Sequence, residues 1–155
     1  MAEFRHMGGM YYEEFEVGMK LDTDSRTVTE GDIITFAGVS GDMNPMHTSA
    51  RFAGATPFGQ RVAHGALVLS MATGLMYRMR IIEGTVLAFR SIDEWKFSQP
   101  VYIGDTIHCQ LEVTETKDAK RLGGGQVVIT VRVFNQEDKL VQKGSLTVLI
   151  ASKPD

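Results

Sequence analysis

The chain has 155 residues, a formal net charge of -3 and a pI near 5.8, with 43% hydrophobic and 23% charged residues. This length fits one domain with a single core, and the acidic balance argues against a nucleic-acid-binding or membrane-binding surface. The single cysteine, Cys109, excludes an intrachain disulfide and a cysteine-based zinc site, so we expect a reducing, cytoplasmic setting.

The first part of the chain predicts a leader, a strand and a short helix. Residues 1–9 (MAEFRHMGG) lack the apolar core of a signal peptide and are a candidate disordered or vector-derived leader to a single domain over 1–155. Residues 20–29 are polar and weakly strand-like, and we expect a strand there. Thr29 followed by Asp32 is a capping-box pattern, which predicts a short helix that ends at Gly41.

The next segment, residues 40–53 (SGDMNPMHTSARFA), places an aspartate and a histidine on either side of an Asn-Pro pair. Pro45 fixes its own backbone dihedral and holds Asn44 extended, so the segment is predicted to be a stiffened loop. Such a loop can hold Asp42 and His47 around one water, with one group taking a proton and the other giving one. The alternative is an ordinary polar turn with a solvated histidine, and spacing alone does not decide between the two.

Residues 65–79 (GALVLSMATGLMYRM) are rich in good helix formers and too short to span a bilayer, so we expect a buried central helix. His64 and Gly65 open this helix, where unpaired backbone amides at the positive end of the helix dipole can receive an oxyanion. A simple helix-start glycine is the alternative. One side of this apolar helix carries a stripe of small or mildly polar residues: Ala66, Ser70, Thr73, Gly74 and Tyr77.

The remainder of the chain predicts strands separated by turn-rich segments. Apolar and polar residues alternate over residues 106–116, which indicates antiparallel strands with one covered face. Short connections favour neighbouring strands pairing in order. We therefore predict an α+β fold in which one curved antiparallel sheet wraps around the central helix. The expected strands are residues 87–97, 106–116, 126–135 and 140–150.

Two motifs carry a resemblance to a known family. Residues 36–53 (FAGVSGDMNPMHTSARFA) resemble the signature of the MaoC-like, or hydratase 2, group of hot-dog-fold proteins. In that signature, G-D-x-N-P-x-H is followed six residues later by a small residue, here Ala53. Residues 62–70 (VAHGALVLS) are similar to a second block of the group, and the likeness in element order extends from about residue 10 to residue 150. The resemblance implies a hot-dog fold and a homodimer or higher homo-oligomer.

The same resemblance implies an (R)-specific enoyl-CoA hydratase, or 3-hydroxyacyl-CoA dehydratase, of fatty acid metabolism that adds water reversibly to a trans-2-enoyl-CoA thioester. Carried onto matching positions, Asp42 and His47 hold the water, and Asn44 orients that pair. Gly65 gives its backbone N–H to the thioester oxygen, and Ser70 faces the same site. No cofactor is expected, because coenzyme A is part of the substrate. Two alternatives stay open: a hot-dog acyl-CoA thioesterase and a non-catalytic acyl-CoA-binding subunit.

The chain departs from the group's pattern at Ser49, where many relatives carry aspartate, and at Ala66, where many carry methionine. Ser49 can still cap the following helical turn, and Ala66 would widen the acyl pocket. A metal site is not expected, because the histidines and carboxylates lack a compact ligand spacing. We expect the helix stripe and nearby aromatic residues to line the acyl pocket, with basic residues available for CoA phosphates. The aromatic candidates are Phe52, Phe58, Tyr77 and Trp95, and the basic ones are Arg51, Arg61, Lys96 and residues 117–121.

Overall fold

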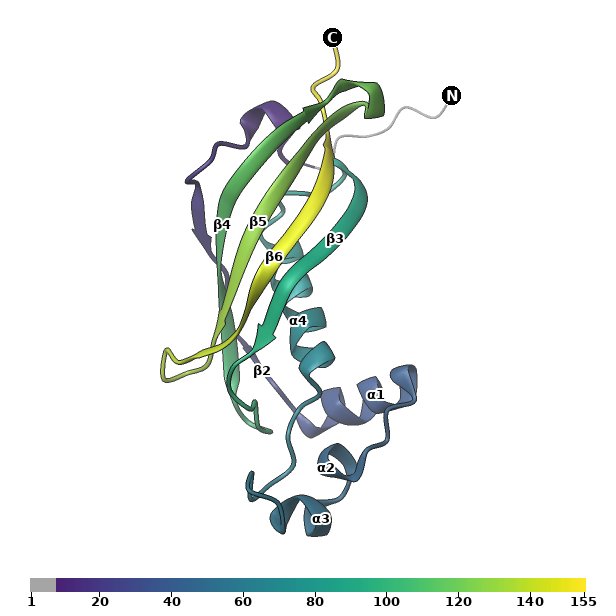
Figure 1. Cartoon of the computed structure of the whole chain (residues 1–155), viewed down its shortest axis with the longest axis vertical. Helices are drawn as coiled ribbons and strands as arrows, with labels where there is room; N and C mark the ends of the chain where they lie inside the picture. Colours follow the sequence, from purple (N-terminus) through teal and green to yellow (C-terminus); the bar gives the residue numbers. More distant parts are fainter. Residues whose placement is uncertain (1–7) are drawn as a thin grey trace.

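One curved antiparallel sheet wraps around a long helix, which confirms the predicted α+β architecture (Figure 1). The computed structural model of the chain describes residues 8–155. The central helix is α4 (Gly65–Arg78), and the strands follow one another across the sheet in the order β1-β4-β5-β6-β3, with β2 also paired to β4. The strands are β1 (Lys20–Asp22), β2 (Arg26–Thr27), β3 (Val86–Phe97), β4 (Thr106–Ala119), β5 (Gly124–Phe134) and β6 (Leu140–Ala151).

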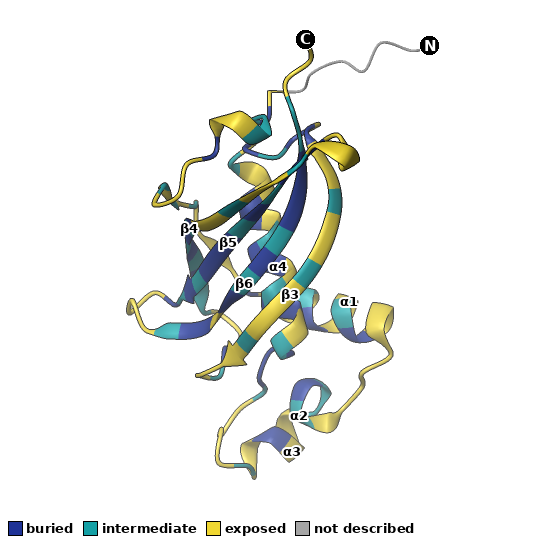
Figure 2. Cartoon of the chain, turned by 45° about the horizontal axis from the view of Figure 1, so that its top comes forward, coloured by how far each residue is buried: buried dark blue, intermediate teal, exposed yellow. Residues whose placement is uncertain are grey.

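The core lies between the concave face of the sheet and the apolar side of α4 (Figure 2). Alternate residues of β4 and β5 are buried, as the alternation predicts, because successive side chains of a strand point to opposite faces. Burial raises the pKa of the Cys109 thiol to about 12, so this cysteine behaves as an apolar core residue. The buried residues of α4 are Leu67, Val68, Met71, Ala72, Leu75 and Met76.

Two strand predictions were wrong in their pairing or extent. β3 pairs with β6 rather than with the next strand in the chain. The segment between β3 and β4 therefore crosses from one edge of the sheet to a strand next to the opposite edge. The expected strand over residues 20–29 is divided into β1 and β2. Both short strands pair with β4, at either side of Thr23, whose N–H donates to the Cys109 carbonyl at 2.9 Å.

Residues 117–125, which separate two of the expected strands, are themselves mostly strand. β4 runs on to Ala119 and pairs with Gly124, so the hairpin connection holds little more than the 3-10 turn η2 (Lys120–Leu122) and Gly123. Gly123 has φ 85° and makes the turn, but Gly124 serves close packing. A Cβ on Gly124 would lie 1.8 Å from the Ile150 carbonyl oxygen.

A group of short helices lies beyond one end of α4, below the sheet in Figure 1. The capping box predicted from Thr29 and Asp32 is confirmed, and the helix ends at Gly41 with φ 76° as expected. Because this end is fixed, the polar segment that follows leaves the helix in a defined direction. The short helices are α1 (Glu30–Ser40), α2 (Pro45–Thr48) and α3 (Ala50–Gly54), and η1 (Tyr12–Glu14) is a separate 3-10 turn that contacts β5.

Most of the expected leader, residues 1–9, falls outside the described residues. Residues 8 and 9 of this leader are described, and the Gly9 N–H donates to the Glu83 carbonyl at 3.0 Å, close to the start of β3. None of the helices within residues 8–155 is long and apolar enough to cross a bilayer.

Candidate active site

The segment after α1 is a helical turn rather than the predicted stiffened loop. Asn44 has extended backbone (φ -51°, ψ 132°), and its Oδ1 accepts the Met46 N–H at 3.2 Å, which makes it the N-cap of α2. Pro45 is the first residue of that helix, where its fixed φ and missing N–H favour helix initiation. The Asn-Pro pair therefore starts a helix, and His47 projects from that helix.

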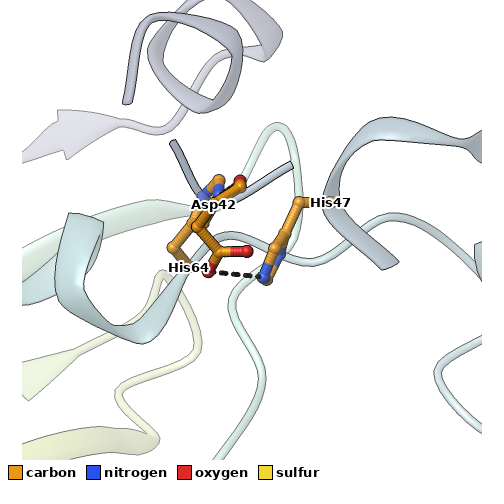
Figure 3. A group of neighbouring side chains, drawn as sticks. All are labelled: Asp42, His47 and His64. Atoms are coloured by element: carbon orange, nitrogen blue, oxygen red, sulfur yellow. Dashed lines mark hydrogen bonds and ion pairs between the residues drawn. The ribbon is translucent and has the colours of Figure 1, made fainter. Parts of the chain in front are cut away.

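Asp42 and His47 point toward one another across a short gap (Figure 3). Asp42 Oδ1 accepts the Asn44 N–H at 3.2 Å, and its Oδ2 lies 3.9 Å from His47 Nε2. That separation is too long for a direct hydrogen bond but lets one water bond to both atoms at about 2.8 Å. The His47 side chain is 9% exposed and that of Asp42 53% exposed, so solvent can reach the gap from the aspartate side.

The tautomer of His47 follows from its other ring nitrogen. His47 Nδ1 lies 2.7 Å from the Val62 carbonyl oxygen, and a carbonyl only accepts hydrogen bonds. Nδ1 therefore carries the proton in the neutral ring, and the lone pair is on Nε2, which faces Asp42. The ring is arranged to take a proton at the atom that borders the gap.

Gly65 begins α4 close to this pair. Among the described residues no side chain caps the helix, which leaves its first amides at the positive end of the helix dipole. A Cβ on Gly65 would lie 2.7 Å from the ring of Phe97, so any larger residue here would displace that ring.

His47 and Gly65 border the same cavity, which has a volume of about 590 Å³. Most of its wall is apolar and a few polar groups interrupt it, which is typical of small-molecule sites. Asp42 does not line this cavity, although it faces His47, which does. The lining residues are Met46, His47, Phe58, Val62, Ala63, Gly65, Ala66, Val68, Phe97, Ser98, Gln99, Pro100, Val101 and Gln142.

The predicted pocket wall is only partly present in the single chain. Phe58 and Ala66 line the cavity, whereas Phe52, Tyr77 and Trp95 do not. Ser70 does not line it, and its hydroxyl donates to the Ala66 carbonyl at 2.8 Å. The stripe of small residues on α4 is therefore largely an exposed face of the helix rather than a pocket wall.

Gln142 was not predicted from the sequence, yet it is buried beside Gly65. The Trp95 indole N–H donates to Gln142 Oε1 at 2.9 Å, and Gln142 Nε2 donates to the Gly65 carbonyl at 3.1 Å. Because an indole N–H only donates and a carbonyl only accepts, these neighbours fix the orientation of the amide. A single glutamine in a strand rich in β-branched residues gives no sequence signal for this contact. The contact joins residues that lie 77 positions apart.

Arg61, a candidate for binding CoA phosphates, has a structural role instead. Its side chain is 11% exposed and forms an ion pair with Glu30 of α1. Its Nε donates to the His47 carbonyl at 2.7 Å, so the guanidinium joins α1 to α2.

The structure brings together a cluster that sequence spacing did not predict. Asp42, His47 and His64 each offer a ligand atom, all within 4.8 Å of one another. The two imidazole rings are stacked, 24° from parallel with centroids 3.8 Å apart. Lone pairs of nearly parallel rings do not converge on one point, as zinc at about 2.0–2.1 Å from each nitrogen requires. The argument from sequence spacing was wrong, because these three residues do come together. The stacked rings are now the reason why we expect no metal at this cluster.

Comparison with known proteins shows which family the chain resembles. Residues 14–135 match the model of the MaoC like domain. An (R)-specific enoyl-CoA hydratase of Aeromonas caviae is 30% identical over 139 residues, covering 90% of this chain and 98% of the relative. A 3-hydroxybutyryl-CoA dehydratase of Methylorubrum extorquens is 32% identical over 112 residues, covering 72% and 69% of the two chains.

Solved structures agree with these sequence matches. A monoamine oxidase regulatory protein from Archaeoglobus fulgidus superposes with a TM-score of 0.87 at 39% identity, covering 94% of this chain and 97% of that one. An unliganded R-hydratase from Pseudomonas aeruginosa gives 0.74 at 33% identity, covering 94% and 88%. A Mycobacterium tuberculosis protein described as a double hotdog fold, 20% identical, gives 0.83 over 97% of this chain and 46% of its own. The predicted hot-dog fold is confirmed.

Replacing Gln142 by leucine tests the buried amide. Gln142→Leu leaves the Trp95 indole without its partner and removes one of the donors to the Gly65 carbonyl, and we expect the free energy of unfolding to fall by about 1–3 kcal/mol. Trp95 is the single tryptophan, so its fluorescence during urea unfolding measures the loss. Gln126→Leu is the matched control on β5, and an equal effect of the two changes would contradict the contact described for Gln142.

Proposed function

Because the chain belongs to the family of MaoC-like domains, we propose that it is an (R)-specific enoyl-CoA hydratase, which adds water reversibly to a trans-2-enoyl-CoA thioester. The observation that carries the proposal is the gap of 3.9 Å between Asp42 Oδ2 and His47 Nε2. His47 and Gly65 border one cavity, so water, base and oxyanion donor can meet a single substrate there. Relatives are named for hydration and for its reverse, dehydration.

Hydration needs a water that loses a proton as its oxygen bonds to C3 of the enoyl group. In our proposal this water sits in the gap, hydrogen-bonded to Asp42 and His47. The pair takes a proton from the water and delivers a proton to C2, so that OH and H are added across the double bond and the pair ends with the protons it began with. Asn44 contributes by capping α2 and by binding Asp42 through its N–H.

Negative charge builds on the thioester oxygen as water adds, and an enolate needs a hydrogen-bond donor at that oxygen. The Gly65 N–H is the candidate, because it begins α4 and borders the cavity. An oxyanion donor of this kind is worth about 3 kcal/mol of the barrier. Gln142 holds the carbonyl of the same residue at 3.1 Å, which steadies the first turn of the helix.

The apolar cavity suits an acyl chain. Ala66 lines it, in keeping with the expectation that a small residue here widens the pocket. Coenzyme A enters as part of the substrate. A thioesterase of the same fold would need a water aimed at the carbonyl carbon, and a non-catalytic subunit would need no acid/base pair.

We further propose that the chain forms a homodimer through β3. This strand is one edge of the sheet, and Figure 2 shows it exposed along much of its length. An exposed apolar edge favours pairing with another chain. The large exposed apolar residues of β3 are Val86, Leu87, Phe89, Ile92 and Phe97.

Activity tests the proposed roles of Asp42 and His47. We expect the wild-type chain to remove the ultraviolet absorbance of a short trans-2-enoyl-CoA and to produce the (R)-3-hydroxyacyl thioester. Asp42→Asn and His47→Ala should each lower kcat by about 10²–10⁴-fold, because general acid/base help is worth that much. Both variants should keep the wild-type far-ultraviolet circular dichroism.

Two matched controls make the same chemical changes elsewhere, Asp22→Asn on β1 and His108→Ala on β4, and both should retain wild-type rates. Wild-type rates in Asp42→Asn and His47→Ala would overturn the roles proposed for these residues. Release of free thiol without loss of the double bond would identify a thioesterase instead. Thermal stabilisation by acyl-CoA without any turnover would identify a binding subunit.

Sedimentation tests the proposed dimer. We expect the wild-type chain to sediment at twice its mass of 17.1 kDa, and Phe89→Lys to shift it toward the monomer by placing a charge on the exposed β3 edge. Val17→Lys is the control, since Val17 is 63% exposed and lies outside the sheet. A wild-type chain that sediments as a monomer at micromolar concentration would contradict the proposal.

A further inference from the structure

His64 contacts both members of the proposed acid/base pair without taking part in the gap between them. Its ring is stacked on that of His47 with centroids 3.8 Å apart, and its Nε2 lies 2.9 Å from the backbone carbonyl oxygen of Asp42. The residue is 2% exposed, and it does not line the cavity. His64 is therefore buried, contacts both functional residues and does not reach the cavity. This arrangement suits a residue that holds the other two in position.

We propose that His64 is a positioning residue for hydration, which holds the Asp42 backbone and the His47 ring so that one water fits between their functional atoms. The inference rests on the proposed function and adds to it a residue that acts through two others. It assigns two separable parts to His64: a ring face that supports His47, and an N–H that binds Asp42.

The ring face supplies a constraint that the other contacts of His47 do not. The bond from His47 Nδ1 to the Val62 carbonyl holds one atom of the ring at 2.7 Å, but the ring could still turn about that bond. Stacking at 24° from parallel fixes the plane of the ring and hence the direction of Nε2. Aim matters here, because a displacement of about 1 Å at a reacting group can cost 10²-fold in rate.

The N–H supplies a second constraint, on Asp42. Because a carbonyl only accepts, His64 Nε2 is the donor in the 2.9 Å hydrogen bond to the Asp42 carbonyl. Asp42 has left α1 and its side chain is half exposed, so this bond anchors its backbone to the start of α4. Among the described residues, His64 Nδ1 has no hydrogen-bond partner, so its functional contacts are the bond from Nε2 and the ring faces.

His64 is itself held in place by a second aromatic contact. The ring of Phe36, on α1, meets it edge-on with centroids 4.9 Å apart and planes at 61°. Phe36, His64 and His47 thus join α1, the N-cap of α4 and α2. Since Gly65 follows His64 directly, the same contact also relates the acid/base pair to the proposed oxyanion donor.

Two variants separate the two parts. His64→Phe keeps an aromatic face for His47 and removes the donor to Asp42, while His64→Gln keeps a donor of similar reach and removes the face. We expect each to lower kcat for a short trans-2-enoyl-CoA by about 10- to 100-fold. We expect KM to change by less than about twofold, since His64 does not line the cavity. His108→Phe and His108→Gln make the same changes on β4 and should leave both constants unchanged.

A second readout keeps the test independent of activity. The imidazole NMR signals of His47 should be a single narrow set in the wild-type chain and should shift or broaden in His64→Gln, because its ring loses the stacked support. If the wild-type chain shows no hydration, the proposed function fails, whereas the NMR result still decides whether His64 holds His47. Should the His64 variants not fold, Phe36→Leu weakens the same contact and should change kcat in the same direction.

Unchanged kcat in folded His64→Phe and His64→Gln, with unchanged His47 signals, would overturn the proposal. A rise in KM with kcat unchanged would also overturn it, because that pattern belongs to a residue that binds substrate.

Discussion

The hydrogen bond between His47 Nδ1 and the Val62 carbonyl, at 2.7 Å, is the interaction on which the site depends. It selects the tautomer of His47 and so places a lone pair on the nitrogen that faces Asp42. The bond is supported from the other direction, because the Val62 N–H donates to the Met46 carbonyl at 3.2 Å. These two bonds attach α2 to the segment that leads into α4. Asp42 is also attached there, because its carbonyl accepts the hydrogen bond from His64, so both members of the acid/base pair are held in place relative to the central helix.

The apolar core and the polar site lie in two different regions of the molecule. The sheet and α4 form the core, whereas the short helices at the end of α4 carry the polar side chains of the site (Figure 1). These helices are joined by polar contacts that converge on His47: Arg61 binds its carbonyl and pairs with Glu30, and His64 stacks on its ring. Buried polar groups with fixed partners specify one geometry, which acid/base chemistry requires.

Local patterns in the sequence predicted the parts of the fold that local physics determines. The capping box at Thr29, the glycine stop at Gly41 and the apolar helix over residues 65–79 all depend on neighbouring residues, and the structure has each of them. Residues 117–125 were expected to separate two strands, but strand continues into them, and Gly124 is required by the carbonyl of Ile150 and not by a turn. Contacts between distant residues were beyond local patterns: Gln142 reaches Gly65 across 77 positions, and β3 pairs with the last strand. The proximity of Asp42 and His47 was predicted, but the buried shell around them was not.

The central claim is that His47 presents a proton-accepting Nε2 to the gap it shares with Asp42. Long-range ¹H–¹⁵N correlation spectra of the imidazole nitrogens measure this directly, with His47 assigned by its absence in His47→Ala. The neutral ring is predicted to carry its proton on Nδ1, with Nε2 unprotonated. A neutral His47 with the proton on Nε2 would contradict the account, because that nitrogen could then take no proton from a water beside Asp42.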